Sequence, residues 1–218
     1  MASATTKEKI IESAVTLFNR DGLVNVRLQH IADEAGMSIG NMTYHYRTKE
    51  LIIEAAWRQL VKKQRELLIE YRIVPLFEDI ERQMRSTFLL QQDYLFFYLD
   101  TLEVVRAFPE IHKAHRQHIE WQVQQLITMF QFNVSRAAFI PAYTVREDSL
   151  GDGYHRQLAQ QYWMASDMWL YRQKVMDADI MDFASYREAL WALLMPHFTP
   201  MGQMEFRQLN DMISHNLL

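Results

Sequence analysis

Glycine and proline, the residues that most often end helices, are few in this chain and mark where its regular structure can stop. The 218 residues include six glycines and five prolines, and no proline precedes Pro75. Between these residues, apolar side chains recur three and four positions apart, which is the spacing of one helix face. No stretch shows the alternation of apolar and polar residues typical of a half-buried strand. The sequence therefore predicts an all-α fold of about nine or ten helices.

Glycine, proline and capping residues also set the expected helix boundaries. We expect helices over residues 6–18, 28–35, 38–46, 48–71, 109–139, 154–175 and 183–195, another beginning at residue 75, and a short one beginning at residue 200. Residues 141–153 are expected to form a loop. We divide the chain into a domain of residues 1–50, which holds the three N-terminal helices, and a domain of residues 51–218.

Charged and aromatic residues are distributed unevenly along the chain. Residues 1–72 carry 11 Lys/Arg and 9 Asp/Glu, whereas residues 73–218 carry 12 and 18, together with 22 of the 27 aromatic residues. A mildly basic part joined to an acidic, aromatic-rich part suggests two separate roles. The small positive excess is weaker than is usual for a nucleic-acid-binding domain, so charge alone does not assign the function.

Composition limits the class of protein. A hydrophobic content of 49% with 23% charged residues is typical of a globular chain and argues against disorder. The absence of cysteine excludes a disulfide framework and a Cys-ligated zinc site, and it is compatible with a reducing cytoplasm. Residues 1–9 lack the apolar core of a signal peptide, and prolines interrupt the longest uncharged stretch, residues 189–204. We therefore expect a cytoplasmic protein without a membrane span.

The three short helices at the N-terminus have the pattern of a helix-turn-helix. Ala32 is small enough for two helices to approach closely, Gly36 can adopt the positive φ of a tight turn, and Ser38 can cap the next helix. With Leu28, Ile31, Met37, Met42 and Tyr46 facing inward, the outward set is Ile39, Asn41, Thr43, Tyr44 and His45. Such side chains suit a major groove, because Asn can read adenine, Ile and Thr can touch a thymine methyl, and Tyr and His can reach phosphates.

Lys49 is expected in the first turn of the following helix, where its charge opposes the helix dipole. We expect a DNA phosphate to offset that charge. The complete set of expected DNA-binding residues is Arg27, Ser38, Ile39, Asn41, Thr43, Tyr44, His45 and Lys49. A three-helix pattern with a glycine turn can also be plain packing, so the pattern by itself leaves the function open.

Several short motifs within residues 6–55 combine into one larger pattern. They are Glu8-Lys9-Ile10-Ile11, Ala14, Leu17-Phe18, Gly22, Ile31-Ala32-Asp33-Glu34-Ala35-Gly36-Met37-Ser38, Tyr44-His45-Tyr46 and Lys49-Glu50-Leu51. Together they resemble the DNA-binding domain of tetracycline-repressor (TetR) type regulators. The resemblance implies a homodimer that represses transcription until a small molecule binds the larger domain. In one departure, Thr43 stands where the family often has the first of two aromatic residues.

The larger domain is expected to hold the effector site. Aromatic and aliphatic residues there are interleaved with polar ones, a composition that suits a small-molecule pocket between helices. The expected ligand-binding residues are Tyr94, Phe97, Trp121, Gln125 and Met129. A large apolar or amphipathic effector is favoured, since methionine and aromatic side chains adapt to such ligands. The alternative is that these residues are simply core.

Two late helices, at residues 154–175 and 183–195, are apolar nearly all round. Such a helix must be covered on both sides, so we expect these two to form a homodimer around a two-fold axis. The alternative is a central helix in a monomer. A two-fold axis would place two recognition helices one DNA turn apart, which predicts a near-palindromic operator in double-stranded DNA.

Other chemistries are less consistent with the sequence. His112, His115 and His118 recur every third residue and drift around a helix, so a metal site is not favoured. Asp177, Asp179 and Asp182 lack the glycine and glutamate of a calcium loop. No nucleophile elbow or phosphate loop is present, so we expect neither a cofactor nor an enzyme. The alternatives are a regulator that activates or senses no ligand, and a helical-bundle small-molecule binding protein or enzyme without sequence-specific DNA binding.

Overall fold

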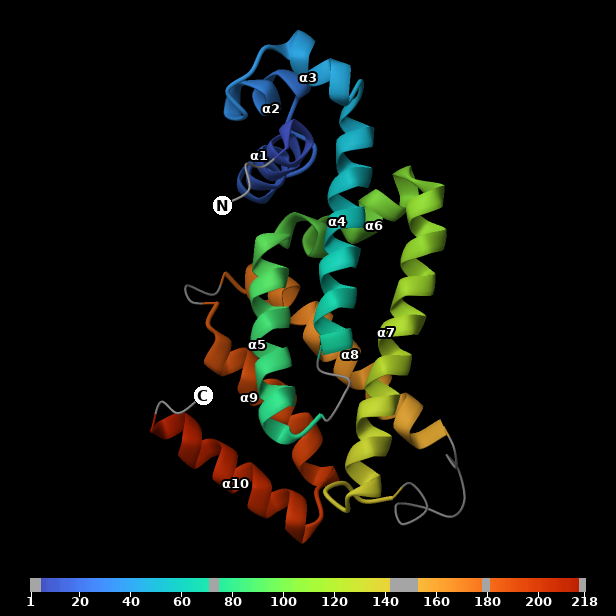
Figure 1. Ribbon diagram of the computed structural model, residues 1–218, viewed down its shortest axis with the longest axis vertical. Coiled ribbons are helices and arrows are strands. Elements are labelled where there is room, and N and C mark those ends of the chain that lie inside the picture. The colour runs from blue at the N-terminus through green and yellow to red at the C-terminus, as the bar shows by residue number, and fades with distance from the viewer. Residues whose placement is uncertain (1–4, 71–74, 142–152, 178–180, 216–218) are drawn as a thin grey trace. The chain divides into compact units, whose positions relative to one another are not determined.

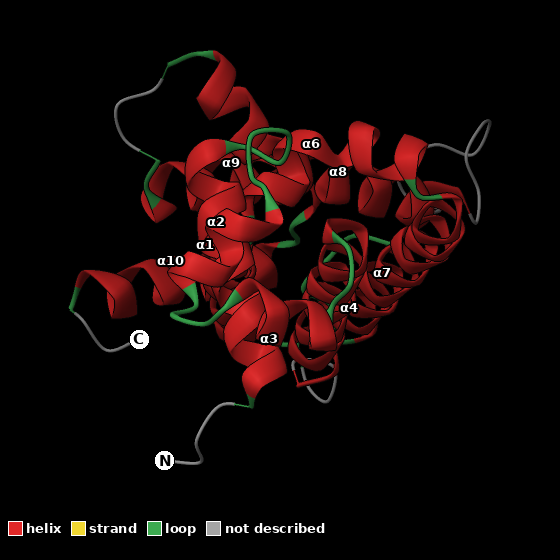
Figure 2. Cartoon of the chain, turned by 90° about the horizontal axis from the view of Figure 1, so that it is seen from above, coloured by secondary structure: helices red, strands yellow, loops and turns green. Residues whose placement is uncertain are grey.

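The computed structural model describes residues 5–70, 75–141, 153–177 and 181–215, and the described chain consists of helices joined by loops (Figures 1 and 2). The ten α-helices of these residues are α1 (Thr6–Asp21), α2 (Leu28–Glu34), α3 (Ile39–His45), α4 (Lys49–Glu70), α5 (Phe77–Asp93), α6 (Leu95–Ala107), α7 (Pro109–Ser135), α8 (Gly153–Val175), α9 (Phe183–Leu194) and α10 (Pro200–Ser214). A short 3-10 helix, Met195–His197, follows α9. The described part contains no strand, only an isolated bridge between Phe139 and Phe198. The predicted all-α fold is confirmed.

Some helix ends differ from those expected or were left open by the sequence. The first helix extends to Asp21 rather than to residue 18. The helix expected from residue 75, for which the sequence set no end, ends at Asp93, and Tyr94 separates α5 from α6. The helix expected over 109–139 ends at Ser135, because Ala137 has a φ of 60° and the N–H groups of Ala138 and Phe139 both donate to the carbonyl of Asn133. The expected loop at 141–153 and the end of the helix at Tyr71 lie outside the described residues.

The chain forms two compact units, one within residues 1–64 and 90–115 and the other within residues 65–89 and 116–218. Helices α4, α5 and α7 therefore each contribute to both units. The first unit is built around α1, which begins with a capping box. The N–H of Thr5 donates to the Glu8 carboxylate at 2.7 Å, and the N–H of Glu8 donates to the Thr5 hydroxyl. Its fully buried side chains include those of Ile10, Phe18, Ile31, Met42, Ile52 and Leu60.

The core of the second unit is rich in aromatic rings and contains one buried ion pair. Phe77 packs against Phe139, Trp191 and Phe198, with ring centroids 4.9–5.9 Å apart. The carboxylate of Glu81, which is 2% exposed, accepts hydrogen bonds from Arg187 Nε and Trp191 Nε1, the latter at 2.7 Å. These bonds fix α5 to α9 and satisfy a carboxylate whose burial would otherwise be costly.

Candidate nucleic-acid interface and internal pocket

Helices α2 and α3 form the expected helix-turn-helix. Ile31, Ala32 and Met42 are fully buried. Gly36 adopts a φ of 63°, and the following N–H, that of Met37, donates to the carbonyl of Ala32 at 3.0 Å. This left-handed backbone conformation reverses the direction of the chain within two residues. Glycine adopts it without the strain that a Cβ atom would cause. The turn therefore forms as the sequence predicts.

The exposed face of α3 carries the side chains that were expected to meet DNA. The Ser38 hydroxyl caps the helix by accepting from the N–H of Asn41 at 3.2 Å. Asn41 is exposed, and the ring of Tyr44 is 85% exposed. The Tyr44 ring meets the ring of the neighbouring His45 edge-on, with centroids 5.2 Å apart, and most of its surface faces solvent.

Four other residues of the expected set are also at least partly exposed. Ile39 is 38% exposed, and Thr43 and His45 are half-buried. The Thr43 hydroxyl donates within its own helix, to the carbonyl of Ile39 at 2.9 Å, so that its methyl group and its acceptor oxygen are left for other contacts. Arg27 is exposed at the N-cap position of α2. The surface thus offers an amide, a phenol, an imidazole and a guanidinium, which are groups that contact base edges and phosphates.

Lys49 differs from this set. Its ammonium group is partly buried and donates to the carbonyls of Leu23 at 2.9 Å and Val26 at 3.0 Å. These two carbonyls belong to the segment that joins α1 to α2. Backbone oxygens of the same unit therefore already stabilise the Lys49 ammonium group, and its expected contact with a DNA phosphate stays a prediction.

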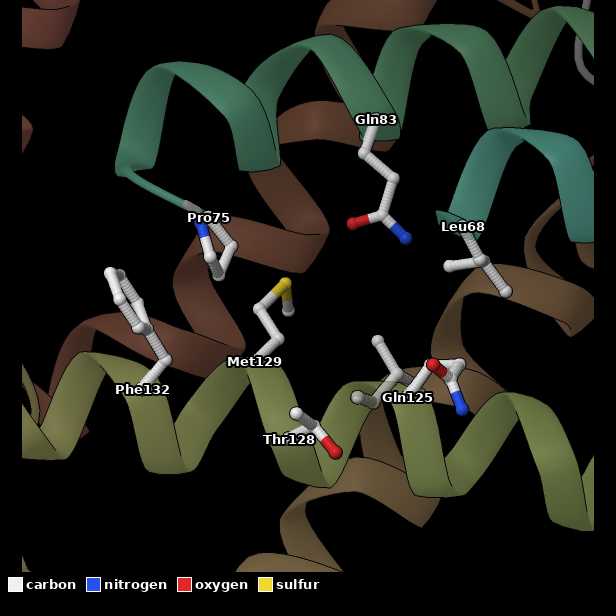
Figure 3. A pocket seen from close by; sticks show the side chains of 8 residues that line it. Leu68, Pro75, Gln83, Gln125, Thr128, Met129 and Phe132 are labelled. Atoms are coloured by element: carbon white, nitrogen blue, oxygen red, sulfur yellow. The ribbon is translucent and has the colours of Figure 1, made fainter. Parts of the chain in front are cut away.

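An internal pocket lies in the second unit, between α4, α5 and α7 (Figure 3). Its volume is about 100 Å³, which is below the range of roughly 300–1,000 Å³ that is usual for small-molecule sites. The lining residues are Leu68, Pro75, Gln83, Gln125, Leu126, Thr128, Met129 and Phe132. Of the expected ligand-binding residues, the structure brings Gln125 and Met129 together here.

Tyr94, Phe97 and Trp121 do not line this pocket. Tyr94 and Phe97 are buried in the first unit, where the Tyr94 hydroxyl donates to Gln59 Oε1 at 2.9 Å and Phe97 packs against His115. Trp121 belongs to the second unit, and the Arg65 guanidinium lies 5.1 Å from its ring centroid. Gln125 and Met129 thus share a pocket within the second unit, and a ligand site formed by all five residues stays a prediction.

Two polar residues inside the second unit were not singled out from the sequence. Gln83 is 6% exposed and projects into the pocket from α5 (Figure 3). Asp167 is half-buried on α8, and burial raises the pKa of its carboxyl to about 7. Each lies among apolar neighbours on its helix, Ile80 and Met84 for Gln83, and Trp163 and Leu170 for Asp167. A polar residue within an apolar helix face is the signal that could have identified them.

The possible metal sites considered from the sequence are not assembled in the described residues. No group of three or more His, Asp or Glu side chains there is arranged to hold a metal ion. Burial and the neighbouring His112 lower the pKa of His115 to about 4. Asp182 caps α9 by accepting from the N–H of Ser185 at 2.7 Å, whereas Asp179 lies outside the described residues. Among the described helices, none has the length and apolar character that crossing a bilayer requires.

Both parts of the chain match models of one protein family. Residues 10–60 match the family described as bacterial regulatory proteins, tetR family, and residues 59–206 match the TetR family described as a bacterial transcriptional repressor. The chain belongs to the TetR family. The resemblance seen in its N-terminal motifs is thereby confirmed and extends over most of the sequence.

Individual relatives of this TetR-family chain are distant. It is 25% identical to the "Probable HTH-type transcriptional regulator YttP" of Bacillus subtilis over 42% of this chain and 61% of that protein. It is 28% identical to the "Probable acrEF/envCD operon repressor" of Escherichia coli over 41% of this chain and 40% of that protein. The chain thus spans less than two thirds of these curated relatives.

The fold of a TetR-family regulator from Marinobacter aquaeolei is also similar. The two structures superpose with a TM-score of 0.82 at 22% identity, over 95% of this chain and 98% of that one. At this level of identity the likeness concerns the fold.

Proposed function

We propose that this TetR-family chain is a dimeric, sequence-specific DNA-binding repressor that a small molecule releases from its operator. The observation that carries the proposal is the exposed face of α3, where Tyr44, 85% exposed, and Asn41 project from a helix whose opposite side is anchored by the buried Met42. The Escherichia coli relative is named as an operon repressor, which supports repression rather than activation. A DNA-independent carrier or enzyme is not favoured, because both parts of the chain match regulator models.

In the proposed complex, α3 enters the major groove. Asn41 reads adenine, while Ile39 and the Thr43 methyl group contact thymine methyls. The phosphate contacts come from Arg27, Ser38, Tyr44 and His45. Lys49 supports the loop before α2, since its ammonium group is already bonded to carbonyls there. Residues 1–50 are the proposed DNA-binding domain and residues 51–218 the proposed effector and dimerisation domain.

The proposed dimer forms through α8 and α9. Met164, Met168 and Tyr171 are 43–50% exposed and recur along one face of α8. The exposed residues of α9 include Ala189 and Ala192, whose small side chains permit close helix approach. An exposed apolar face of this extent is typical of a protein interface. A two-fold axis between such faces sets the recognition helices about 34–36 Å apart, so we propose a near-palindromic operator.

The effector is proposed to act by differential affinity. A ligand that binds better to the form with altered spacing of the recognition helices shifts the population away from DNA. The proposed protein is not an enzyme, uses no cofactor, and works in the cytoplasm. Its partners are the operator, the effector and a second copy of itself.

Selection of bound sequences from random double-stranded DNA, at low and at physiological salt, tests the proposal. Enrichment of a near-palindrome that survives the higher salt supports base reading by a dimer. Unselective binding that disappears with salt would mean phosphate attraction alone and would overturn it.

On the selected operator, Tyr44→Ala is expected to lower affinity about tenfold or more, since a hydrogen bond to a charged group such as a phosphate contributes roughly 1.5–3 kcal/mol. Because Tyr44 is exposed, the melting temperature should be unchanged. Fluorescence anisotropy and thermal unfolding measure the two effects. Tyr44→Phe separates the hydroxyl from the ring. Full operator affinity in Tyr44→Ala would remove this residue from the proposed interface.

A further inference from the structure

Two glutamine side chains, those of Gln83 and Gln125, face one pocket without a hydrogen-bond partner in the described chain. Gln83 is 6% exposed, and its amide, which opens onto the pocket, makes no hydrogen bond within the described residues. Gln125 Oε1 is buried and also lacks a partner within the described chain. Buried polar groups are nearly always paired, and an unpaired one costs about 1–3 kcal/mol. Both side chains line the pocket between α4, α5 and α7.

Figure 3 shows how the two side chains are placed. The amide of Gln83 projects from α5 into the open space, and Gln125 lies on α7 across the pocket from α5. The Thr128 hydroxyl is directed elsewhere, because it donates to the carbonyl of Gln124 in its own helix at 3.0 Å. The polar groups available to a ligand are therefore the two amides, which together offer hydrogen-bond donors and acceptors.

The rest of the lining is apolar and uncharged. It consists of Leu68, Pro75, Leu126, Met129 and Phe132, and among the described residues that line the pocket there is no Asp, Glu, Lys, Arg or His. A charged group placed here would lose its hydration without gaining a counter-charge, which is costly. The lining therefore selects for an uncharged ligand group.

One end of the pocket is held in place by a buried side chain. Asn133, which is fully buried, donates from Nδ2 to the carbonyl of Pro75 at 3.0 Å and to the carbonyl of Met129 at 2.9 Å. Its Oδ1 accepts from the Arg136 guanidinium, which also pairs with Glu205. The pocket wall at Pro75 is thus tied to α7 through a satisfied network, whereas the two glutamines are left without partners.

The size of the cavity limits what can enter. Its volume is about 100 Å³. It is less than the roughly 150 Å³ cavity that accommodates benzene. The pocket can therefore accept a terminal group on a short chain but not a large ring system.

We propose that this pocket binds the uncharged terminal group of the effector, a primary carboxamide or an alcohol carried on a short aliphatic chain. The group accepts a hydrogen bond from the Gln83 amide and donates one to Gln125 Oε1, while its carbon atoms contact Leu68, Leu126 and Met129. The claim that this ligand acts as an effector rests on the proposed function, whereas the claim that it binds the pocket does not.

Titration of the full-length protein with butyramide, butyrate and butylammonium tests the proposal directly. The probes have chains of similar length and differ in charge. In ¹⁵N spectra of the side-chain amides, the Gln83 signals, identified by their loss in Gln83→Met, should shift saturably with butyramide. Butyrate and butylammonium should bind at least tenfold more weakly. Equal binding of all three probes, or no shift with butyramide up to its solubility limit, would overturn the assignment.

Two variants and one control separate ligand recognition from packing. Gln83→Met and Gln125→Met should each weaken butyramide binding at least tenfold, as measured by calorimetry. Because each removes an unpaired polar group, the melting temperature of the ligand-free protein should stay the same or rise. Gln124→Met changes an exposed neighbour on α7 and should leave butyramide binding unchanged. Lower melting temperatures with undiminished butyramide binding would assign the glutamines a structural role instead.

DNA binding is measured separately, so the two proposals can fail independently. If butyramide binds but operator affinity is unaltered, the pocket stands and the effector role is lost. If the protein binds an operator but shows no amide selectivity, the repressor stands and the pocket assignment is lost.

Discussion

At the scale of single residues, Lys49 shows how a tertiary contact can reverse the role suggested by a local pattern. Its first-turn position predicts repulsion from the helix dipole, but its ammonium group holds the carbonyls of Leu23 and Val26. A hydrogen bond from a charged group contributes about 1.5–3 kcal/mol. Lys49 therefore supports the loop that precedes the helix-turn-helix.

We expect Lys49→Met to lower both stability and operator affinity. The free energy of unfolding should fall by about 1.5–3 kcal/mol, as measured by urea denaturation. The slope of log affinity against log salt should remain that of the wild type, because no phosphate contact is removed. A slope reduced by about one, with unchanged stability, would instead show that Lys49 neutralises a phosphate. Lys113→Met, at an exposed position, is the control.

Asp167 gives the stability of the protein a defined pH dependence. Burial raises the pKa of its carboxyl to about 7, so the folded state favours the protonated form. The folded state then binds more protons than the unfolded state between about pH 4 and 7, and stability falls as pH rises through this range.

Asp167→Asn should remove this contribution. We expect the variant to melt about 3–6 °C above the wild type at pH 8, with a smaller difference at pH 5. Scanning calorimetry at both pH values measures the effect. The exposed Asp211→Asn serves as the control. A variant that is less stable than the wild type at pH 8 would mean that the Asp167 carboxylate makes a favourable interaction when charged.

At the scale of elements, the break between α5 and α6 is decided by a residue far away in sequence. Asn19 Nδ2 donates to the carbonyl of Asp93 at 2.8 Å, and the N–H of Phe96 donates to Asn19 Oδ1 at 2.9 Å. One side chain of α1 thus satisfies both the last carbonyl of α5 and a first-turn N–H of α6. Neither proline nor glycine marks the break, so the local sequence does not show where it falls.

The start of α10 depends on the absence of a side chain at Gly202. A Cβ at this position would lie 2.2 Å from the backbone carbonyl oxygen of Ala138. Gly202→Ala is therefore expected to destabilise the protein by about 2–4 kcal/mol, as a severe overpacking change. Gly153→Ala, where a Cβ would meet nothing within 4 Å, should change stability by less than about 0.5 kcal/mol. Thermal unfolding of both variants measures the contrast, and equal melting temperatures would contradict it.

At the scale of the whole molecule, the proposed function requires two copies of the chain. Met168→Glu places a charge in the exposed apolar face of α8 and should convert the dimer to a monomer, which light scattering detects. Operator affinity should then fall more than tenfold, because each monomer binds a single half-site. Met204→Glu on α10 is a matched control, since the two methionines are 50% and 49% exposed. Dissociation by Met204→Glu alone would place the interface on α10.

The sequence by itself determined the helical class, most helix positions and the helix-turn-helix. These features depend on interactions within a few residues, such as the capping of α3 by Ser38 and the positive φ of Gly36. The exposed face of α3 could also be predicted, because helical periodicity alone places Asn41 and Tyr44 opposite Met42.

Only the tertiary structure decided the bonds of Lys49, the break at Tyr94 and the membership of the internal pocket. Each of these joins residues from separate helices or loops, and the periodicity of one helix shows that a side chain is buried without showing what it meets. Gln125 was predicted to face a ligand, but its counterpart Gln83, 42 positions earlier, became visible only once α5 and α7 were placed around the same cavity.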